Sequence, residues 1–457
     1  MESPKLELHP EAAKAFNAVA AKLVESLQTP EPRPTPDGSA FVPQVFAAAH
    51  VTTKDIVGDF RTGQVLSVLP EIEVSRDYVR NNEQLGLGRE GYFRLLKIVE
   101  KIQTAPGFRS AVSTKCLLDL AFDWLLKRRQ QRIETSFADH LISEASSQIT
   151  ERTIWLPVQR LYIESDIALG RVVFRTITPQ MLDRYSSQYG SQSIGSEEGK
   201  QAWAADVLKL RKKFQGTAAA TVKTLAEPIR ANEIALDEAR IAVGLLRFFQ
   251  AASVIPNVKS YCALQTDPNL VMLEYLIEQG SNINHSAKTM FEGPSGCSLS
   301  NQDIGFLKVS ALDRLNLILS KPARTDFESV LLDSMLLYSR ANLTADPSDK
   351  LVYIFAALET MFLKDGSEPI QSNLGDRLAW VVGPTVEERI KVAKLVKEVY
   401  AMRSRFVHHG RAPRDLETMA QFMQYSWNAL CALLKKTESV QTKSALIDDL
   451  DRRKMGG

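Results

Sequence analysis

Cysteine and histidine are scarce in this chain of 457 residues, which has four cysteines and six histidines. The cysteines are spread along the chain, and none belongs to a CxxC pair. This spacing argues against a disulfide framework or a zinc knuckle and favours buried free thiols in a reducing cytoplasm. The histidines are also dispersed, apart from the adjacent pair His408 and His409, so we expect neither a metal site nor a cofactor.

Long hydrophobic runs are missing as well. The most apolar stretch, residues 241–255, is interrupted by Arg247 and Gln250, and it is shorter than the roughly 20 apolar residues that span a bilayer. The first residues, MESPKLELHPEAAKAF, lack the apolar region of a secretory signal. We therefore expect a cytoplasmic protein that makes no contact with a membrane.

Neither sign of charge dominates, because 56 lysines and arginines are balanced by 54 aspartates and glutamates. The net charge of +2 excludes a polybasic protein that binds nucleic acid through bulk charge. Any contact with nucleic acid must come from a local basic cluster. The length suggests two to four domains, at roughly 100–200 residues per domain.

Apolar periodicity predicts a mainly α-helical fold with a smaller β-containing part in the N-terminal and middle regions. Residues 1–28 are predicted to form a helical arm, with docking of this helix onto the main body as the alternative, and residues 29–44 a proline-rich linker. Residues 45–322 are predicted to be a mixed α/β sensor or regulatory region. Within it, residues 153–178 have the clearest β-signal and predict two to four strands.

The last part of the chain differs in kind, because from Thr325 onward apolar residues recur every three or four positions. This spacing predicts five amphipathic helices that form a bundle over residues 325–440, the fourth running from about 386 to 408. A charged tail follows over residues 441–457, and its end, DDLDRRKMGG at residues 448–457, is predicted to be frayed.

Three other motifs have weaker functional interpretations. Residues 86–91 spell GxGxxG, but polar residues precede them where a dinucleotide site needs a strand, so a loop that caps a helix is favoured. Gly293–Cys297 lacks the buried strand that precedes a nucleophile elbow, which favours a turn. The basic residues at 127–129 and 209–213 lie on helices with apolar opposite faces, which is typical of a solvated surface.

A cationic cluster at the end of the predicted fourth helix carries the clearest chemistry. Residues 403–414 contain four arginines and two histidines and no acidic residue. Gly410 and Pro413 predict that the helix ends here, which places His408 and His409 in its last turn, where a protonated imidazole is favoured. An imidazole can move a proton while a guanidinium neutralises charge on a phosphorane, which together suffice for metal-free phosphodiester cleavage.

The spacing of this cluster poses a geometric difficulty. Arg403 and His408 are five residues apart, so on an ideal helix their side chains diverge by about 140°. Either the last turn is distorted or a second copy of the chain completes the site. The alternative is a cation-rich helix end with capping histidines and no catalytic role.

At these residues the sequence resembles the HEPN superfamily, in particular the Apea-like HEPN domains. The family hallmark is an arginine followed four to six residues later by a histidine, late in a helical bundle. Residues that match its pattern here are Tyr400, Arg403, Ser404, Val407, His408 and Gly410, with His409 inserted before the glycine. Upstream, LVYIFAALETMF with Glu359 and LGDRLAWVVG with Arg377 resemble two further family helices, so the resemblance covers about residues 325–440.

The resemblance implies a C-terminal HEPN-like bundle that forms a homodimer, in which two such motifs face one groove. It implies metal-independent endoribonuclease activity, in which the ribose 2′-OH attacks the adjacent phosphate. His408 would be the general acid/base and Arg403 the phosphate clamp, with His409, Ser404 and Glu359 as further catalytic or supporting residues. The neighbouring cations Arg405, Arg411 and Arg414 are expected to bind RNA phosphates.

Many proteins of this superfamily act as toxins or abortive-infection effectors against phage. The leading hypothesis is therefore a defence ribonuclease that its N-terminal region keeps inactive until a trigger, such as a phage-derived partner, releases it. The alternative is a non-catalytic HEPN-containing protein that serves assembly or sensing in a defence complex. A nucleotide-binding enzyme built on residues 86–91 is the weakest of the three hypotheses.

Overall fold

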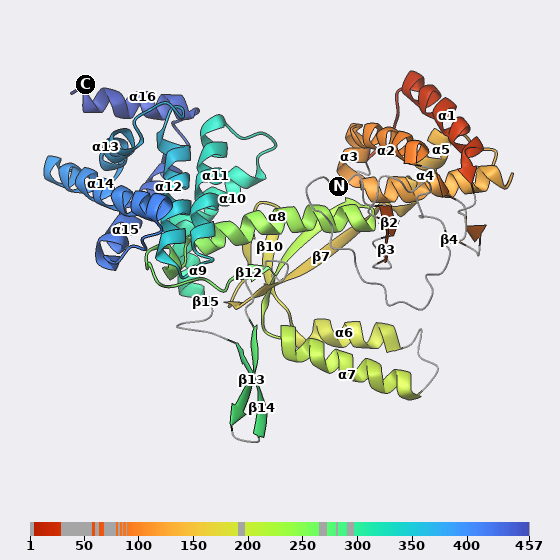
Figure 1. Cartoon of the computed structure of the whole chain (residues 1–457), viewed down its shortest axis with the longest axis horizontal. Coiled ribbons are helices and arrows are strands. Elements are labelled where there is room, and N and C mark those ends of the chain that lie inside the picture. The colour runs from red at the N-terminus through yellow and green to blue at the C-terminus, as the bar shows by residue number, and fades with distance from the viewer. Residues whose placement is uncertain are drawn as a thin grey trace. The chain divides into compact units, whose positions relative to one another are not determined.

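The computed structural model describes residues 4–28, 57–59, 64–67, 79–80, 83–84, 86–87, 89–190, 197–264, 272–279, 282–289 and 297–456. Over these residues the protein is mainly helical with a small antiparallel sheet in the middle of the chain (Figure 1). This confirms the predicted coarse fold class. The predicted proline-rich linker, residues 29–44, lies outside the described residues.

The chain forms two compact units, one of residues 1–152 and 224–234 and the other of residues 153–223 and 235–457. The second unit therefore contains both the sheet and the C-terminal helices. One buried apolar cluster includes Phe174 of the sheet and Phe355 of the bundle. The expected boundary near residues 322–325 thus does not separate two cores, because the sheet and the bundle bury their apolar faces in the same one.

Among the described residues, the helices that lie wholly in the first unit are α1 Pro10–Glu25, α2 Arg89–Gln103, α3 Pro106–Ala111, α4 Thr114–Arg129 and α5 Phe137–Gln148. Serine side chains cap two of them: Ser113 accepts from the Cys116 N–H in α4, and Ser136 accepts from the Asp139 N–H in α5.

The interpretation of residues 1–28 as a free arm is wrong. Ala20 and Leu23 of α1 are buried, and the Ala138 N–H of α5 donates to the Asn17 side chain at 2.8 Å. The apolar side of α1 is buried within the first unit, as the docking alternative requires.

Short strand pairs also belong to the first unit. They pair β1 Leu27–Gln28 with β6 Gly86–Leu87, β2 Val57–Asp59 with β3 Gln64–Ser67, and β4 Val79–Arg80 with β5 Glu83–Gln84, all antiparallel. The GxGxxG motif thus begins in an antiparallel pair and leads into α2. A dinucleotide fingerprint instead follows a strand of a parallel βαβ unit.

The sheet of the second unit has five strands in the order β12-β7-β11-β10-β9. Their bounds are β7 Thr150–Gln159, β9 Ile167–Leu169, β10 Val172–Thr176, β11 Ala218–Ala226 and β12 Ala263–Leu264. With β8 Leu161–Ile163, four strands begin within or just before residues 153–178, which confirms the predicted β-region. Gly170 adopts φ 62° in the β9–β10 turn, a backbone conformation that favours glycine.

The second unit also contains helices and shorter strands outside this sheet. Between residues 179 and 320 the described helices are α6 Pro179–Gly190, α7 Glu197–Phe214, α8 Pro228–Phe248, α9 Asn301–Leu307 and α10 Asp313–Ser320, with a π-helical turn over Lys308–Leu312 between the last two. Strand β15 Cys297–Leu299 pairs in parallel with β8, and β13 Met272–Gln279 pairs with β14 Asn282–Thr289. The expected turn at residues 293–296 lies outside the described residues.

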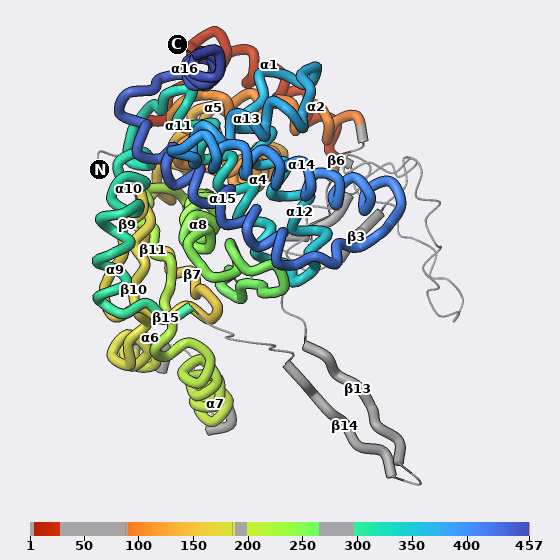
Figure 2. Tube along the Cα trace, turned by 90° about the vertical axis from the view of Figure 1, so that its left-hand side faces the viewer, coloured from red at the N-terminus to blue at the C-terminus, as the bar shows by residue number. Residues whose placement is uncertain are grey.

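Six helices follow residue 325, with the bounds α11 Asp326–Ala341, α12 Pro347–Phe362, α13 Ile370–Val382, α14 Val386–His409, α15 Leu416–Lys436 and α16 Lys443–Lys454. Helix α14 lies beside α13 and α15 (Figures 1 and 2). The first five confirm the helices that apolar spacing predicts. In the described part of the chain, no helix is both long and apolar enough to cross a membrane.

The prediction of a frayed charged tail is wrong, because residues 443–454 form α16. Leu446, Ile447 and Leu450 of this helix are buried. Its Asp451 also accepts two hydrogen bonds from Arg377 of α13, at 2.9 and 3.0 Å. The segment therefore has a short apolar face that packs on the bundle, although most of its side chains are polar or charged.

Candidate functional site at the end of helix α14

Helix α14 begins and ends at strong local signals. At its start, Thr385 and Glu388 form a reciprocal capping box. At its end, Gly410 adopts φ 63°, and its N–H donates to the Phe406 carbonyl at 2.8 Å. The predicted helix end at Gly410 is therefore confirmed, and His408 and His409 lie in the last turn.

Arg403 of α14 faces Glu359 of α12. Their charged groups are 3.9 Å apart, and each side chain is 24% exposed. Among the described residues, neither Nε of Arg403 nor Oε1 of Glu359 has a hydrogen-bond partner, although both atoms are buried. The two groups therefore form a half-buried ion pair whose hydrogen-bonding capacity is only partly used.

Burial raises the pKa of Glu359, and the positive charge of Arg403 opposes that shift. The cause is desolvation, which disfavours the carboxylate when it leaves water. Arg403 thus supplies the charge that favours ionised Glu359. A phosphate that approached Arg403 would compete with this carboxylate for the same guanidinium.

Aromatic packing places Arg403 beside the bundle. The guanidinium carbon of Arg403 lies 5.8 Å from the centre of the Tyr400 ring. Tyr400 in turn packs edge-on against Phe355 of α12, with 5.4 Å between ring centres. Phe355 is fully buried and stacks on Phe422 of α15. The position of Arg403 is therefore coupled to the central packing of three helices.

The imidazoles of the cluster face solvent. His408 and His409 are both exposed, and their ring centres are 6.4 Å apart. The exposed cations Arg405, Arg411 and Arg414 lie in the same turn or in the segment that follows it. In the portion that the structure describes, none of these three arginines forms an ion pair with a carboxylate.

One copy of the chain does not bring the predicted catalytic groups together. Arg403 is turned toward α12, whereas His408 and His409 are exposed in the last turn, consistent with the divergence expected on a regular helix. Ser404 is half-buried, and on the helix it lies between the side that carries Arg403 and the side that carries His408. The geometric difficulty therefore persists in the structure, which has no distorted last turn at this end of α14.

Two polar features outside this cluster escaped the sequence analysis. Lys350 of α12 is fully buried, and its ammonium donates to the carbonyls of Ala252, Ile255 and Val258. Its spacing of four from Ile354 on the buried side of α12 was the available signal. The second is a pocket beside Trp155 of β7, whose other residues come from β10, from α6 and from the segment between them. Periodicity treats these strands only as core elements.

No cluster of three or more potential metal ligands occurs among the residues that the structure describes. Cys116 is a buried thiol, and burial raises its pKa to about 12. This thiol is thus a poor metal ligand and a weak nucleophile near neutral pH. No protein-family model, curated protein sequence or solved structure matches the chain.

Proposed function

We propose that the C-terminal helices form a HEPN-like, metal-independent endoribonuclease that acts as a homodimer in the cytoplasm. The observation that carries this proposal is the acid-free helix end, where two exposed imidazoles and three exposed arginines follow a half-buried Arg403–Glu359 pair. This arrangement combines proton-transfer groups with cations that suit a phosphodiester.

Cleavage in this proposal needs only groups of the protein and the RNA. An imidazole removes the proton of the ribose 2′-OH, and the 2′-oxygen forms a bond to the adjacent phosphorus. The bond from phosphorus to the 5′-oxygen breaks, and a second, protonated imidazole donates a proton to that oxygen. The products are a 2′,3′-cyclic phosphate and a 5′-OH end.

A second copy of the chain supplies what one copy lacks. When two α14 ends face each other, His408 of one copy can approach the phosphate that Arg403 of the other copy contacts. Arg403 then stabilises the charge that develops on the phosphorane. Glu359 keeps this guanidinium on the α12 side until the phosphate competes for it.

The remaining cations contribute binding rather than chemistry. Arg405, Arg411 and Arg414 are exposed and carry no carboxylate partner among the described residues, so they are available to RNA phosphates. The rest of the chain would regulate access to this site. An anti-phage role, in which a phage-derived trigger releases the activity, follows only from the family resemblance.

The direct test incubates RNA with purified protein in excess EDTA. Native protein should cleave, whereas His408→Ala and Arg403→Ala should lose activity by about 100-fold or more. His409→Ala shows which imidazole acts. Lys394→Ala is the matched control, because it removes an exposed cation from the same helix, at a position more than two turns before Arg403. Cleavage by His408→Ala and His409→Ala at the native rate would contradict the proposal.

A non-catalytic role in assembly or sensing is the second candidate, and one observation favours it. Arg403 already has a counter-charge inside its own bundle, as a purely structural arginine would. Toxicity on expression separates the two candidates. Toxicity that disappears with His408→Ala indicates catalysis, whereas toxicity that survives both histidine substitutions indicates assembly or sensing alone.

A further inference from the structure

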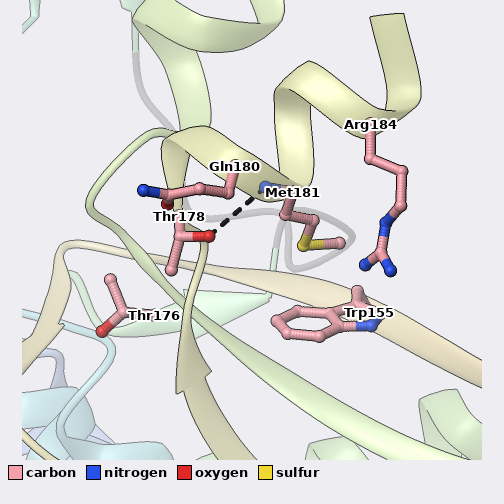
Figure 3. Close-up of a pocket in the computed structure, with 6 residues that line it drawn as sticks. All are labelled: Trp155, Thr176, Thr178, Gln180, Met181 and Arg184. Carbon is pink, nitrogen blue, oxygen red and sulfur yellow. Dashed lines mark hydrogen bonds between the residues drawn. The ribbon is translucent and has the colours of Figure 1, made fainter. Parts of the chain in front are cut away.

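A pocket of about 450 Å³ lies between the sheet and the first turns of α6, within the second unit (Figure 3). The residues that line it are Trp155, Thr176, Thr178, Gln180, Met181 and Arg184. Its volume falls within the range of small-molecule sites, roughly 300–1,000 Å³. It shares no residue with the cluster at the end of α14.

One side of the pocket is aromatic and apolar. Trp155 of β7 and Met181 of α6 pack against a small buried cluster made of Ile177, Leu182 and Ala219. The indole of Trp155 is only partly buried, and it borders the pocket. A partly exposed tryptophan beside a methionine is a surface on which a planar ring can stack.

Two threonine hydroxyls present opposite hydrogen-bonding character to the pocket. The Thr178 hydroxyl accepts from the Met181 N–H at 3.3 Å, which leaves its own O–H to donate. The Thr176 hydroxyl donates to the Ile163 carbonyl at 3.2 Å, which leaves its lone pairs to accept. With the Gln180 amide, this edge can bind a ligand that carries both donors and acceptors.

Arg184 supplies a cation at the tryptophan side. Its side chain extends from α6 toward Trp155 (Figure 3). Within the part of the chain that the structure describes, its guanidinium has no hydrogen-bond or ion-pair partner. The adjacent carboxylate, Asp183, pairs with Arg211 of α7 instead. Arg184 is therefore available to an anionic ligand group, for which its fork geometry suits a phosphate.

From this combination we propose that the pocket binds a nucleoside monophosphate, with its base stacked on Trp155 and its phosphate paired with Arg184. A neutral aromatic ligand would not need the unpaired guanidinium, and a sugar phosphate would not need the indole. Base stacking on an aromatic side chain and a charge-assisted bond to phosphate are each substantial sources of affinity. The proposal does not depend on the nuclease proposal.

The test is calorimetric titration of the full-length protein with the four common nucleoside 5′-monophosphates, their nucleosides and ribose 5-phosphate. At least one monophosphate should bind, and its nucleoside should bind more weakly. Arg184→Gln should weaken binding of that monophosphate about tenfold or more and leave the nucleoside affinity unchanged. Trp155→Leu should weaken binding of both the monophosphate and its nucleoside.

Arg240→Gln is the matched control, because it removes a half-exposed arginine of α8 that does not line the pocket. The affinity of Arg240→Gln for the monophosphate should equal that of the native protein. Absence of monophosphate binding at millimolar concentration would overturn the proposal, and so would equal binding of ribose 5-phosphate. An unchanged monophosphate affinity in Arg184→Gln would also overturn the proposal. Because Arg184 is exposed, this variant should fold, so the test holds even if Trp155→Leu fails to fold. The His408→Ala variant should bind the monophosphate as tightly as the native protein does, so the outcome of this test is independent of the outcome of the nuclease test.

Discussion

Removing the guanidinium of Arg377 should open the contact between helices α13 and α16. Arg377 is 5% exposed and donates to both oxygens of Glu368, at 2.7 and 2.8 Å. It also donates to both oxygens of Asp451 in α16, and to the Phe362 carbonyl at 2.6 Å. The substitution Arg377→Met keeps much of the side-chain volume and removes all five hydrogen bonds.

The expected cost follows from this geometry. Removing one partner of a buried ion pair leaves the other charge uncompensated and costs about 3–5 kcal/mol. Asp451 keeps a second cation, Lys364, at 3.3 Å, which favours the lower half of that range. At 1.4 kcal/mol per tenfold, about 3 kcal/mol corresponds to roughly a 100-fold larger open population of α16.

Hydrogen exchange of the α16 amides measures this opening directly. The matched control is Lys454→Met, which removes another cation between the same two helices. Lys454 pairs with Asp376, and the two side chains are 50% and 34% exposed. An exposed pair contributes about 0.2–1 kcal/mol, so exchange should rise by less than roughly fivefold.

Acid should erase the difference between Arg377→Met and the native protein. Hydrogen bonds from Arg377 lower the pKa of both Glu368 and Asp451. A lowered carboxyl pKa adds stability that is present above the unfolded-state pKa, near 4, and is lost as the pH falls through the folded-state pKa. Equal hydrogen exchange of the α16 amides in Arg377→Met and the native protein at pH 7 would refute the argument from burial.

Three further predictions concern other charges. Glu359→Gln should change the free energy of unfolding by less than about 1 kcal/mol. Arg403→Met leaves the Glu359 carboxylate unpaired and should lower the free energy of unfolding by about 1–3 kcal/mol. Thermal unfolding of the two variants tests this order, and equal losses of stability would contradict it. Burial lowers the pKa of Lys350 to about 7. Between pH 7 and the usual pKa of lysine, the unfolded state binds one proton more than the folded state, so the free energy of unfolding should rise with pH by up to about 1.4 kcal/mol per pH unit. Unfolding titrations at several pH values measure this slope, which Lys350→Met should lack. Arg411→Gln and Arg414→Gln should each reduce the salt slope of RNA binding by about 0.7 in filter-binding titrations, and an unchanged slope would show that these side chains do not meet phosphate.

Local sequence signals sufficed for much of the second unit. The apolar spacing of α11 to α15 predicts these helices, because an apolar stripe with a period near 3.6 can be buried only in that conformation. Gly410 ends α14 where predicted, since a left-handed residue at a helix end favours glycine. The β-branched residues of 153–178 likewise predict the strands around Gly170.

Segments of mixed character were not predictable in the same way. The apolar residues Leu446, Ile447 and Leu450 of α16 are surrounded by charge, so their burial depends on the surface that α13 offers. Whether α1 is an arm or a docked helix depends in the same way on the helices that cover Ala20 and Leu23. Such segments are decided by tertiary packing, which overrides weak local preference.

The residues of the candidate site were found from the sequence, because arginine, histidine and a helix-ending glycine within twelve positions are visible there. Helix geometry also predicted that Arg403 and His408 diverge, but the sequence did not show which groups their side chains face. Only the fold pairs Arg403 with Glu359, which is 44 positions earlier in the chain, and only the fold brings Trp155 and Arg184 to one pocket. Side-chain chemistry is a property of the sequence, whereas the approach of distant side chains depends on how helices and strands bury their apolar faces against one another.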